Sequence, residues 1–226
     1  MKLVRPGDPG FAIEETLLSA TECDTLLQTL CETSVPRSRA GARHLMASPA
    51  VAALAGDPRL VAIAREKLGP NATPFRATLF EKSSQTNWLI PWHQDTALPL
   101  TSAFDAPQWS AWSEKGGTVY AHAPAWALSR VIALRVHLDA STADNGPLRV
   151  IPYSHGSGVL TDSALLDHVR HHHHVACLVP RGGVLAMRPL LIHSSSKARN
   201  TEPRRVLHIE YSESLDLSPG IRLAVV

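Results

Sequence analysis

The tetrapeptide Trp92-His93-Gln94-Asp95, taken together with His193 far downstream, sets the fold that this chain is expected to adopt. Successive side chains of an extended strand face opposite sides, so His93 and Asp95 share one side and Gln94 takes the other. Two histidines and one carboxylate can hold a single iron and leave positions open for further ligands. If His193 lies on a strand that faces this pair across a closed sheet, several strands must run between them.

The sequence contains candidates for those intervening strands. Apolar or alternating runs occur at residues 131–138, 148–151, 175–179 and 184–187. A second pair, His137-Leu138-Asp139, has the same form, but only three of these runs follow it before His193. His208-Ile209-Glu210 is a glutamate version of the motif.

The alternation within residues 131–138 also disfavours His137 as a ligand. It places Ile132, Leu134, Val136 and Leu138 on one apolar face and His137 on the other. We therefore interpret His137 as a strand histidine that is hydrogen-bonded to a neighbour.

Several motifs follow one another in a fixed order. They are Leu79-Phe80-Glu81-Lys82, Trp92-His93-Gln94-Asp95, Asp144-Asn145-Gly146-Pro147-Leu148, Ile151-Pro152-Tyr153-Ser154-His155, and His193-Ser194-Ser195 through Arg204. Together they resemble the phytanoyl-CoA dioxygenase family, over about residues 75 to 212. That family consists of oxygenases dependent on Fe(II) and 2-oxoglutarate. The resemblance implies a mainly β fold with flanking helices, a double-stranded β-helix of the cupin-like jelly-roll type.

The resemblance also implies a site. His93, Asp95 and His193 become the catalytic iron ligands, and Arg204 binds the far carboxylate of 2-oxoglutarate with Ser195 assisting. The planar, permanently charged arginine fork suits a carboxylate better than a lysine does. Arg205 would point the other way on an extended segment, so we expect it to be an exposed surface charge.

Lys82 has two interpretations. It shares one face of a strand with Arg76, Thr78 and Phe80, and this face is expected near the co-substrate at the mouth of the barrel. Lys82 is therefore a candidate cofactor-binding residue, although a surface charge is the favoured interpretation. Asn145-Gly146-Pro147 is typical of a turn and has no predicted catalytic role.

The implied activity is that of a 2-oxoglutarate-dependent dioxygenase that uses dioxygen to hydroxylate a small molecule, with release of succinate and CO2. Related iron enzymes that chlorinate have a small residue in place of Asp95, so a carboxylate there favours hydroxylation. Two alternatives stay open: a non-catalytic jelly roll that binds a metal or ligand, and an oxygenase with another outcome, such as desaturation or epimerisation. No nucleotide-binding signature points to a CoA ester as substrate.

The composition fits one domain over residues 1–226. The net charge is only +2 and the basic residues are scattered, which argues against nucleic acid as a partner. No apolar run is long enough to cross a membrane, and the start Met1-Lys2-Leu3-Val4-Arg5-Pro6 lacks the apolar core of a signal peptide. We therefore predict a cytosolic protein whose three cysteines, Cys23, Cys31 and Cys177, are reduced. The oligomeric state is left open.

Three further segments carry predictions. Cap residues and apolar spacing predict helices within residues 19–69 that pack against the sheet. Residues 96–127 are rich in tryptophan and proline and are expected to be irregular, forming either a substrate lid or a loop anchored by its tryptophans. The run His171-His172-His173-His174 follows a short predicted helix and is interpreted as an adventitious metal binder.

Overall fold

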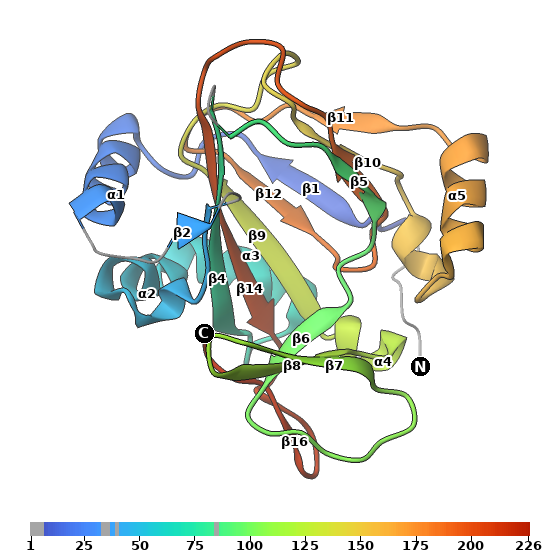
Figure 1. Ribbon diagram of the computed structural model, residues 1–226. Helices are drawn as coiled ribbons and strands as arrows, with labels where there is room; N and C mark the ends of the chain where they lie inside the picture. Colours follow the sequence, from blue (N-terminus) through green and yellow to red (C-terminus); the bar gives the residue numbers. More distant parts are fainter. Residues whose placement is uncertain (1–6, 33–36, 39–40, 84–85) are drawn as a thin grey trace.

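Two antiparallel sheets face each other in the computed structural model, which describes residues 7–32, 37–38, 41–83 and 86–226 (Figure 1). The larger sheet has the order β1-β12-β9-β14-β4-β3-β2, with β1 Phe11–Glu14, β12 Val184–Met187, β9 Val131–His137, β14 Arg204–Ser212, β4 Thr73–Lys82, β3 Gly41–Ala42 and β2 Arg37–Ser38. The smaller sheet has the order β11-β10-β13-β5, with β11 Val175–Cys177, β10 Leu148–Val150, β13 His193–Ser195 and β5 Ile90–His93. This arrangement confirms the predicted mainly β jelly-roll fold.

Two smaller sheets and the helices surround this core. The three-stranded sheet has the order β6-β8-β7, with β6 Ala97–Leu100, β8 Thr118–His122 and β7 Ser110–Lys115, and β15 Asp216–Ser218 pairs with β16 Ile221–Arg222. The helices are α1 Ala20–Glu32, α2 Pro49–Ala55, α3 Pro58–Leu68, α4 Ala125–Leu128 and α5 Asp162–His171, with 3-10 turns η1 Leu45–Ala47 and η2 Ser154–Ser157.

Strand β9, in the interior of the larger sheet, has two apolar neighbourhoods, one on each side of the sheet. Its residues Ile132, Leu134 and Val136 belong to the apolar cluster that contains the buried residues of the N-terminal helices. Ala133 packs instead with residues of the smaller sheet, in the space between the two sheets. The alternation predicted from the sequence is therefore confirmed, and it directs Arg135 and His137 into the barrel.

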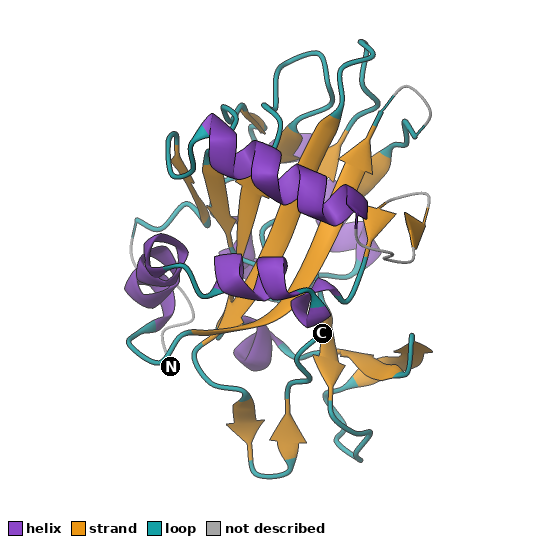
Figure 2. Ribbon diagram, turned by 90° about the vertical axis from the view of Figure 1, so that its left-hand side faces the viewer, coloured by secondary structure: helices purple, strands orange, loops and turns teal. Residues whose placement is uncertain are grey.

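The N-terminal helices lie across the outer face of the larger sheet (Figure 2). Helix α1 begins with a capping box, since the Ser19 hydroxyl accepts from the Glu22 amide at 3.2 Å and the Glu22 carboxylate accepts from the Ser19 amide at 2.7 Å. Helix α3 begins after Asp57, whose carboxylate accepts from the Arg59 amide at 2.8 Å. The buried Tyr211 hydroxyl on β14 donates to the Ala55 carbonyl at 2.8 Å and so ties α2 to the sheet.

The expectation that residues 96–127 are irregular is wrong, because they contain the three-stranded sheet and most of α4. Pro99 lies in the edge strand β6, and every residue of β7 is exposed, so neither strand shows the alternation that marks a half-buried strand. Trp109 and Trp126 do lie in an apolar cluster under this sheet, whereas Trp112 is exposed. The anchoring by tryptophans is thus observed, and a lid function stays a prediction.

In the described part of the chain, none of the helices combines the length and apolar character required to cross a membrane. The predicted absence of a signal peptide concerns residues 1–6, which lie outside the described residues. Cys23, Cys31 and Cys177 are free thiols, as predicted.

Candidate metal and co-substrate site

Strands β5 and β13 bring the three predicted ligands together. His93 and His193 are direct cross-strand partners in the smaller sheet, and their ring centroids lie 4.1 Å apart. Asp95 follows β5 by two residues, and its amide donates to the Pro189 carbonyl at 2.9 Å. One potential ligand atom from each of the three side chains lies within 4.8 Å of the others, so the set can hold a single metal ion.

Gln94 points away from this set, as predicted, and fixes the chain between the two ligands. Its amide nitrogen donates to the carbonyls of Gly158 at 2.9 Å and Leu190 at 2.8 Å. Its carbonyl oxygen accepts from the Leu160 amide at 2.9 Å. Three hydrogen bonds from one side chain therefore limit how Asp95 can move relative to His93.

The backbone also orients both imidazoles. The Nδ1 of His93 lies 2.9 Å from the Pro91 carbonyl, and the Nδ1 of His193 lies 2.8 Å from the Leu191 carbonyl. A carbonyl only accepts, so each Nδ1 carries the proton and each Nε2 has its lone pair free for a metal. Both Nε2 atoms lie 3.5 Å from an oxygen of Asp95, which means that the three lone-pair donors converge.

The electrostatics favour the protonation states that a metal requires. Burial lowers the pKa of His193 to about 4, so this ring is neutral near pH 7. Burial acts to raise the pKa of Asp95, but the electrostatic interaction with His193 and the hydrogen bond from His93 outweigh it and lower the pKa well below its ordinary value. Burial also acts against a charged His93, yet the hydrogen bond to Asp95 raises the His93 pKa. A bound cation replaces that proton.

A cluster of buried cations lies beyond this triad on the inner face of the larger sheet. Arg204 on β14 pairs across the sheet with Lys82 on β4. The Lys82 ammonium donates to the Ser195 hydroxyl at 2.7 Å, and an Arg204 Nη atom donates to the same hydroxyl at 3.2 Å. Ser195 in turn donates to the Gly146 carbonyl at 2.8 Å. We call Lys82, Ser195 and Arg204 the cationic cradle.

The cradle has an excess of positive charge without an anion to balance it. Burial, followed by repulsion from Arg204 and Arg135, lowers the pKa of Lys82 to about 7. Burial and repulsion from Arg135 lower the pKa of Arg204 to about 9. Among the described residues, no carboxylate forms an ion pair with either cation, and Nε and Nη1 of Arg204 have no hydrogen-bond partner. A dicarboxylate such as 2-oxoglutarate fits this donor set, because it supplies the missing charge and acceptors.

Three sequence-based expectations about neighbouring residues are wrong. Lys82 is 1% exposed and is therefore not a surface charge. Arg205 does point away from Arg204, but it forms a partly buried, bidentate ion pair with Asp139 at 2.7 and 2.8 Å. Within the described structure, neither ring nitrogen of His137 has a hydrogen-bond partner. The rival motif thus uses Asp139 to hold Arg205.

The glutamate version of the motif, His208-Ile209-Glu210, also contacts residues outside the triad. The Nδ1 of His208 lies 3.1 Å from Nη1 of Arg135, and Glu210 forms an ion pair with Arg76. Arg135 also stacks on Phe80, with 5.3 Å between the guanidinium carbon and the ring centroid.

An open cleft of about 320 Å³ leads to the triad from one side. Asp95 and Arg76 line it, together with Arg43, Lys115 and Tyr120. A volume of this size suits a small molecule.

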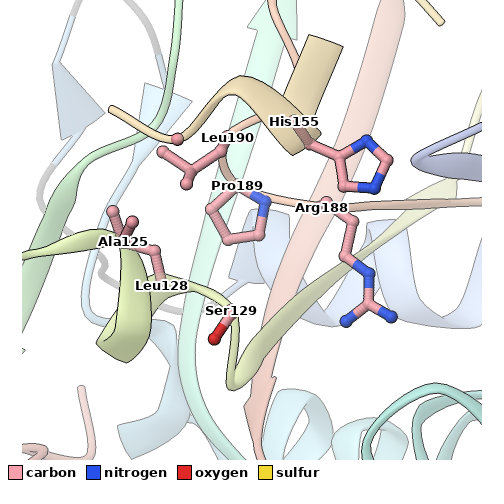
Figure 3. Close-up of a pocket in the computed structure, with 8 residues that line it drawn as sticks. Ala125, Leu128, Ser129, His155, Arg188, Pro189 and Leu190 are labelled. Carbon is pink, nitrogen blue, oxygen red and sulfur yellow. The ribbon is translucent and has the colours of Figure 1, made fainter. Parts of the chain in front are cut away.

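The cavity in Figure 3 is different in kind. It lies between α4 and the segment that carries Arg188, Pro189 and Leu190, and the buried His155 ring borders it. Its volume of about 20 Å³ has room for one water molecule, so it cannot be the substrate site.

Sequence reasoning missed several residues around the site. Gly146, interpreted only as a turn, supplies the carbonyl that orients Ser195, and a Cβ atom added there would lie 2.3 Å from the Ser196 carbonyl oxygen. Arg135 was not singled out, although the alternation that turned His137 inward also turns Arg135 inward. Arg43 has no local signal in the sequence, because only the pairing of β3 with β4 brings it to the cleft.

The fold and this constellation define a double-stranded β-helix protein with a two-histidine, one-carboxylate candidate metal site. The family model described as phytanoyl-CoA dioxygenase (PhyH) matches residues 8–206, and the chain belongs to this family. The resemblance inferred from the ordered motifs is therefore confirmed.

Individual relatives are more distant. The chain is 27% identical over 181 residues to L-proline trans-4-hydroxylase of Streptomyces griseoviridis, covering 69% of the chain and 60% of that curated relative's length. Among solved structures, EctD from S. alaskensis with 2-oxoglutarate and 5-hydroxyectoine matches with a TM-score of 0.68 at 22% identity, over 90% of this chain and 72% of that one. HygX from Streptomyces hygroscopicus with nickel and 2-oxoglutarate matches with a TM-score of 0.66 at 16% identity, over 90% and 83%. These structural likenesses concern the fold.

Proposed function

We propose that this protein is an Fe(II)- and 2-oxoglutarate-dependent dioxygenase that hydroxylates a small molecule and releases succinate and CO2. The observation that carries the proposal is the cationic cradle, whose buried and unbalanced charge lies behind a convergent His-Asp-His set. A purely structural core would not retain a buried lysine and arginine without a carboxylate partner. The family membership and the relatives described above as binding 2-oxoglutarate support the same assignment.

Each residue has a definite task in this proposal. His93, Asp95 and His193 hold Fe(II), and Arg204 with Lys82 and Ser195 holds the distal carboxylate of 2-oxoglutarate. The bound iron and co-substrate supply the oxidising power, since 2-oxoglutarate is decarboxylated as dioxygen is reduced. The protein binds and orients both components and limits the access of water. Asp95 occupies the position that is small in chlorinating relatives, which favours hydroxylation as the outcome.

An anaerobic titration of metal-stripped protein with Fe(II) and then 2-oxoglutarate tests the assignment. The visible charge-transfer band of the iron–2-oxoglutarate chelate reports binding without requiring a substrate. We expect a band in the wild-type protein, no band in His193→Ala, and at least about tenfold weaker 2-oxoglutarate binding in Arg204→Ala, because a charge-assisted pair is lost.

Matched controls come from the chain itself. Arg205→Gln removes the adjacent arginine, which faces away from the cradle, and should leave 2-oxoglutarate binding unchanged. His173→Ala removes an exposed histidine from the His171-His172-His173-His174 run and should leave the band intact while reducing adventitious metal uptake. A folded, iron-loaded protein that shows no band would contradict the proposal and favour a non-catalytic metal-binding jelly roll. Succinate release during aerobic turnover separates catalysis from binding alone.

A further inference from the structure

The cleft beside the triad contains a second group of cations, separate from the cradle. We propose that Arg43 and Lys115 recognise a carboxylate on the substrate, so that the substrate is a small, carboxylate-bearing molecule. This inference rests on the proposed function and specifies the class of substrate. It requires that the two cations are held together, that they are not already neutralised, and that 2-oxoglutarate does not use them.

A network of aromatic contacts holds the two cations at the same side of the cleft. The Lys115 ammonium lies 5.0 Å from the centre of the Tyr120 ring, and the Tyr120 hydroxyl lies 2.9 Å from Nε2 of His44. His44 directly follows Arg43 and has a left-handed backbone with φ of 60°, which is uncommon for a residue with a side chain. The turn after Lys115 fits closely against it, because a Cβ atom added at Gly116 would lie 2.9 Å from the His44 ring. The β7–β8 hairpin is thereby joined to the segment after β3.

The cleft carries more positive than negative charge. Arg43, Arg76 and Lys115 line it, and Glu210 forms an ion pair with Arg76. Asp95 also lines the cleft, but its carboxylate is committed to the metal in the proposed function. Among the described residues, no carboxylate forms an ion pair with Arg43 or Lys115, which leaves two cations free to attract an anion. Both side chains are exposed at the mouth of the cleft, where their positive charge attracts an anionic substrate.

The second cation group is too far from the cradle to serve the same co-substrate. Ala42 pairs with Leu79, so Arg43 lies level with Thr78, four residues from Lys82 or about 13 Å along β4. The four carbon–carbon bonds of 2-oxoglutarate span at most about 6 Å. One molecule held by Lys82 and Arg204 therefore cannot reach Arg43 and Lys115, and these residues face the substrate.

The remaining lining is mixed, and the size of the cleft limits the class of substrate. Thr78, Thr96 and His122 contribute polar groups to the cleft, and Phe80, Ala97 and the Tyr120 ring contribute apolar ones. A volume of about 320 Å³ is too small to enclose a long hydrocarbon chain, whereas a small acid fits it and finds hydrogen-bond partners there. We therefore infer a short carboxylic acid rather than a fatty-acyl substrate.

A panel of small carboxylic acids paired with their primary amides tests this inference. L-proline and L-prolinamide form the first pair, because a curated relative is an L-proline hydroxylase. Binding is followed anaerobically by the change that each compound causes in the iron–2-oxoglutarate band, and turnover is followed by succinate release and product mass. We expect at least one acid to bind at least about tenfold more tightly than its amide. In Arg43→Gln and Lys115→Gln that preference should fall about tenfold, while 2-oxoglutarate affinity is unchanged.

Arg65→Gln is the matched control, because it removes one exposed arginine from α3 on the outer face of the protein. It should retain the preference for acids. The inference is overturned if no acid of the panel binds, if acids and amides bind equally, or if the Arg43 and Lys115 variants behave like Arg65→Gln. If the wild-type protein forms no iron–2-oxoglutarate band, the proposed function itself is contradicted. Failure of the proposed function and failure of the substrate inference are therefore distinguishable.

Discussion

Replacing Lys82 by methionine should make the metal-free protein more stable and its co-substrate binding weaker. Lys82 is 1% exposed, and burial is the main cause that lowers its pKa from 10.5 to about 7. Methionine has similar volume and flexibility but no charge to desolvate. The substitution therefore removes a cost to folding along with a ligand for 2-oxoglutarate.

The pKa shift sets the size of the effect. At pH 6 the buried charge of Lys82 costs about 4 to 5 kcal/mol relative to the unfolded chain, because its pKa falls from 10.5 to about 7 and each tenfold change in the protonation equilibrium corresponds to about 1.4 kcal/mol. The hydrogen bonds that Lys82 donates to Ser195 and Ser196 offset about 2 to 3 kcal/mol of this cost. The net gain for Lys82→Met is about 2 kcal/mol, or roughly 4 to 8 °C in Tm for a chain of this size.

The stability gained by Lys82→Met should also depend on pH. Between about pH 7 and 10.5 the unfolded chain binds a proton at Lys82 that the folded protein does not, so wild-type stability rises with pH relative to the variant. The cost of burying the charged Lys82 is greatest below pH 7, and it falls by about 2.5 kcal/mol between pH 6 and pH 9. The advantage of Lys82→Met should therefore nearly vanish at pH 9.

Chemical denaturation of the metal-stripped proteins at pH 6 and pH 9 measures this difference. Anaerobic titration with 2-oxoglutarate measures the loss of binding, expected to be at least about tenfold. A variant that is less stable than wild type at pH 6, or a stability difference that does not change with pH, would refute the reasoning from Lys82 desolvation. Unchanged 2-oxoglutarate affinity would remove Lys82 from the cradle.

Three further changes have expected outcomes. Gly146→Ala should lower both stability and 2-oxoglutarate affinity, because φ is +69° there and a Cβ atom would lie 2.3 Å from the Ser196 carbonyl oxygen; denaturation and the anaerobic titration measure the two effects. Gln94→Leu should weaken Fe(II) binding in a competition with a chelator while 2-oxoglutarate still binds the iron-loaded fraction, since Gln94 only fixes the chain between two ligands. Tyr211→Phe should cost about 1 to 2 kcal/mol in denaturation, because the Ala55 carbonyl loses its buried donor, and should leave the charge-transfer band unchanged.

The parts of the fold that sequence reasoning predicted are those with a strong periodic signal. All four runs expected between Asp95 and His193 are strands, and helices α1 and α3 lie within residues 19–69 as predicted. Strand β1 and helix α2 were missed because each is short, with four and seven residues, and neither completes enough periods to stand out. Strand β7 is wholly exposed and shows no apolar alternation at all.

The site was harder to predict because the usual link between polarity and exposure fails inside this barrel. A surface charge was the favoured interpretation of Lys82, although the face that it shares with Arg76 and Thr78 was expected near the co-substrate. That face in fact points between the two sheets, where a polar lining serves ligands and not solvent. The pairing of Arg205 with Asp139 was invisible for another reason: the partners are 66 residues apart and only the β14–β9 ladder joins them.

The inner face of β4 explains how such a barrel can change its substrate and keep its chemistry. Lys82 and Arg76 are held on one continuous strand, so the spacing between the cradle and the cleft is set by a backbone that is hydrogen-bonded to β14 along its length. Arg43 and Lys115, by contrast, come from the segment after β3 and from the exposed β7. Substitutions in those peripheral segments can alter which acid is accepted without disturbing the position of 2-oxoglutarate or iron. Selectivity and catalysis are thus carried by different elements, and variants of Arg43 and Lys115 should change the preferred substrate before they reduce co-substrate binding.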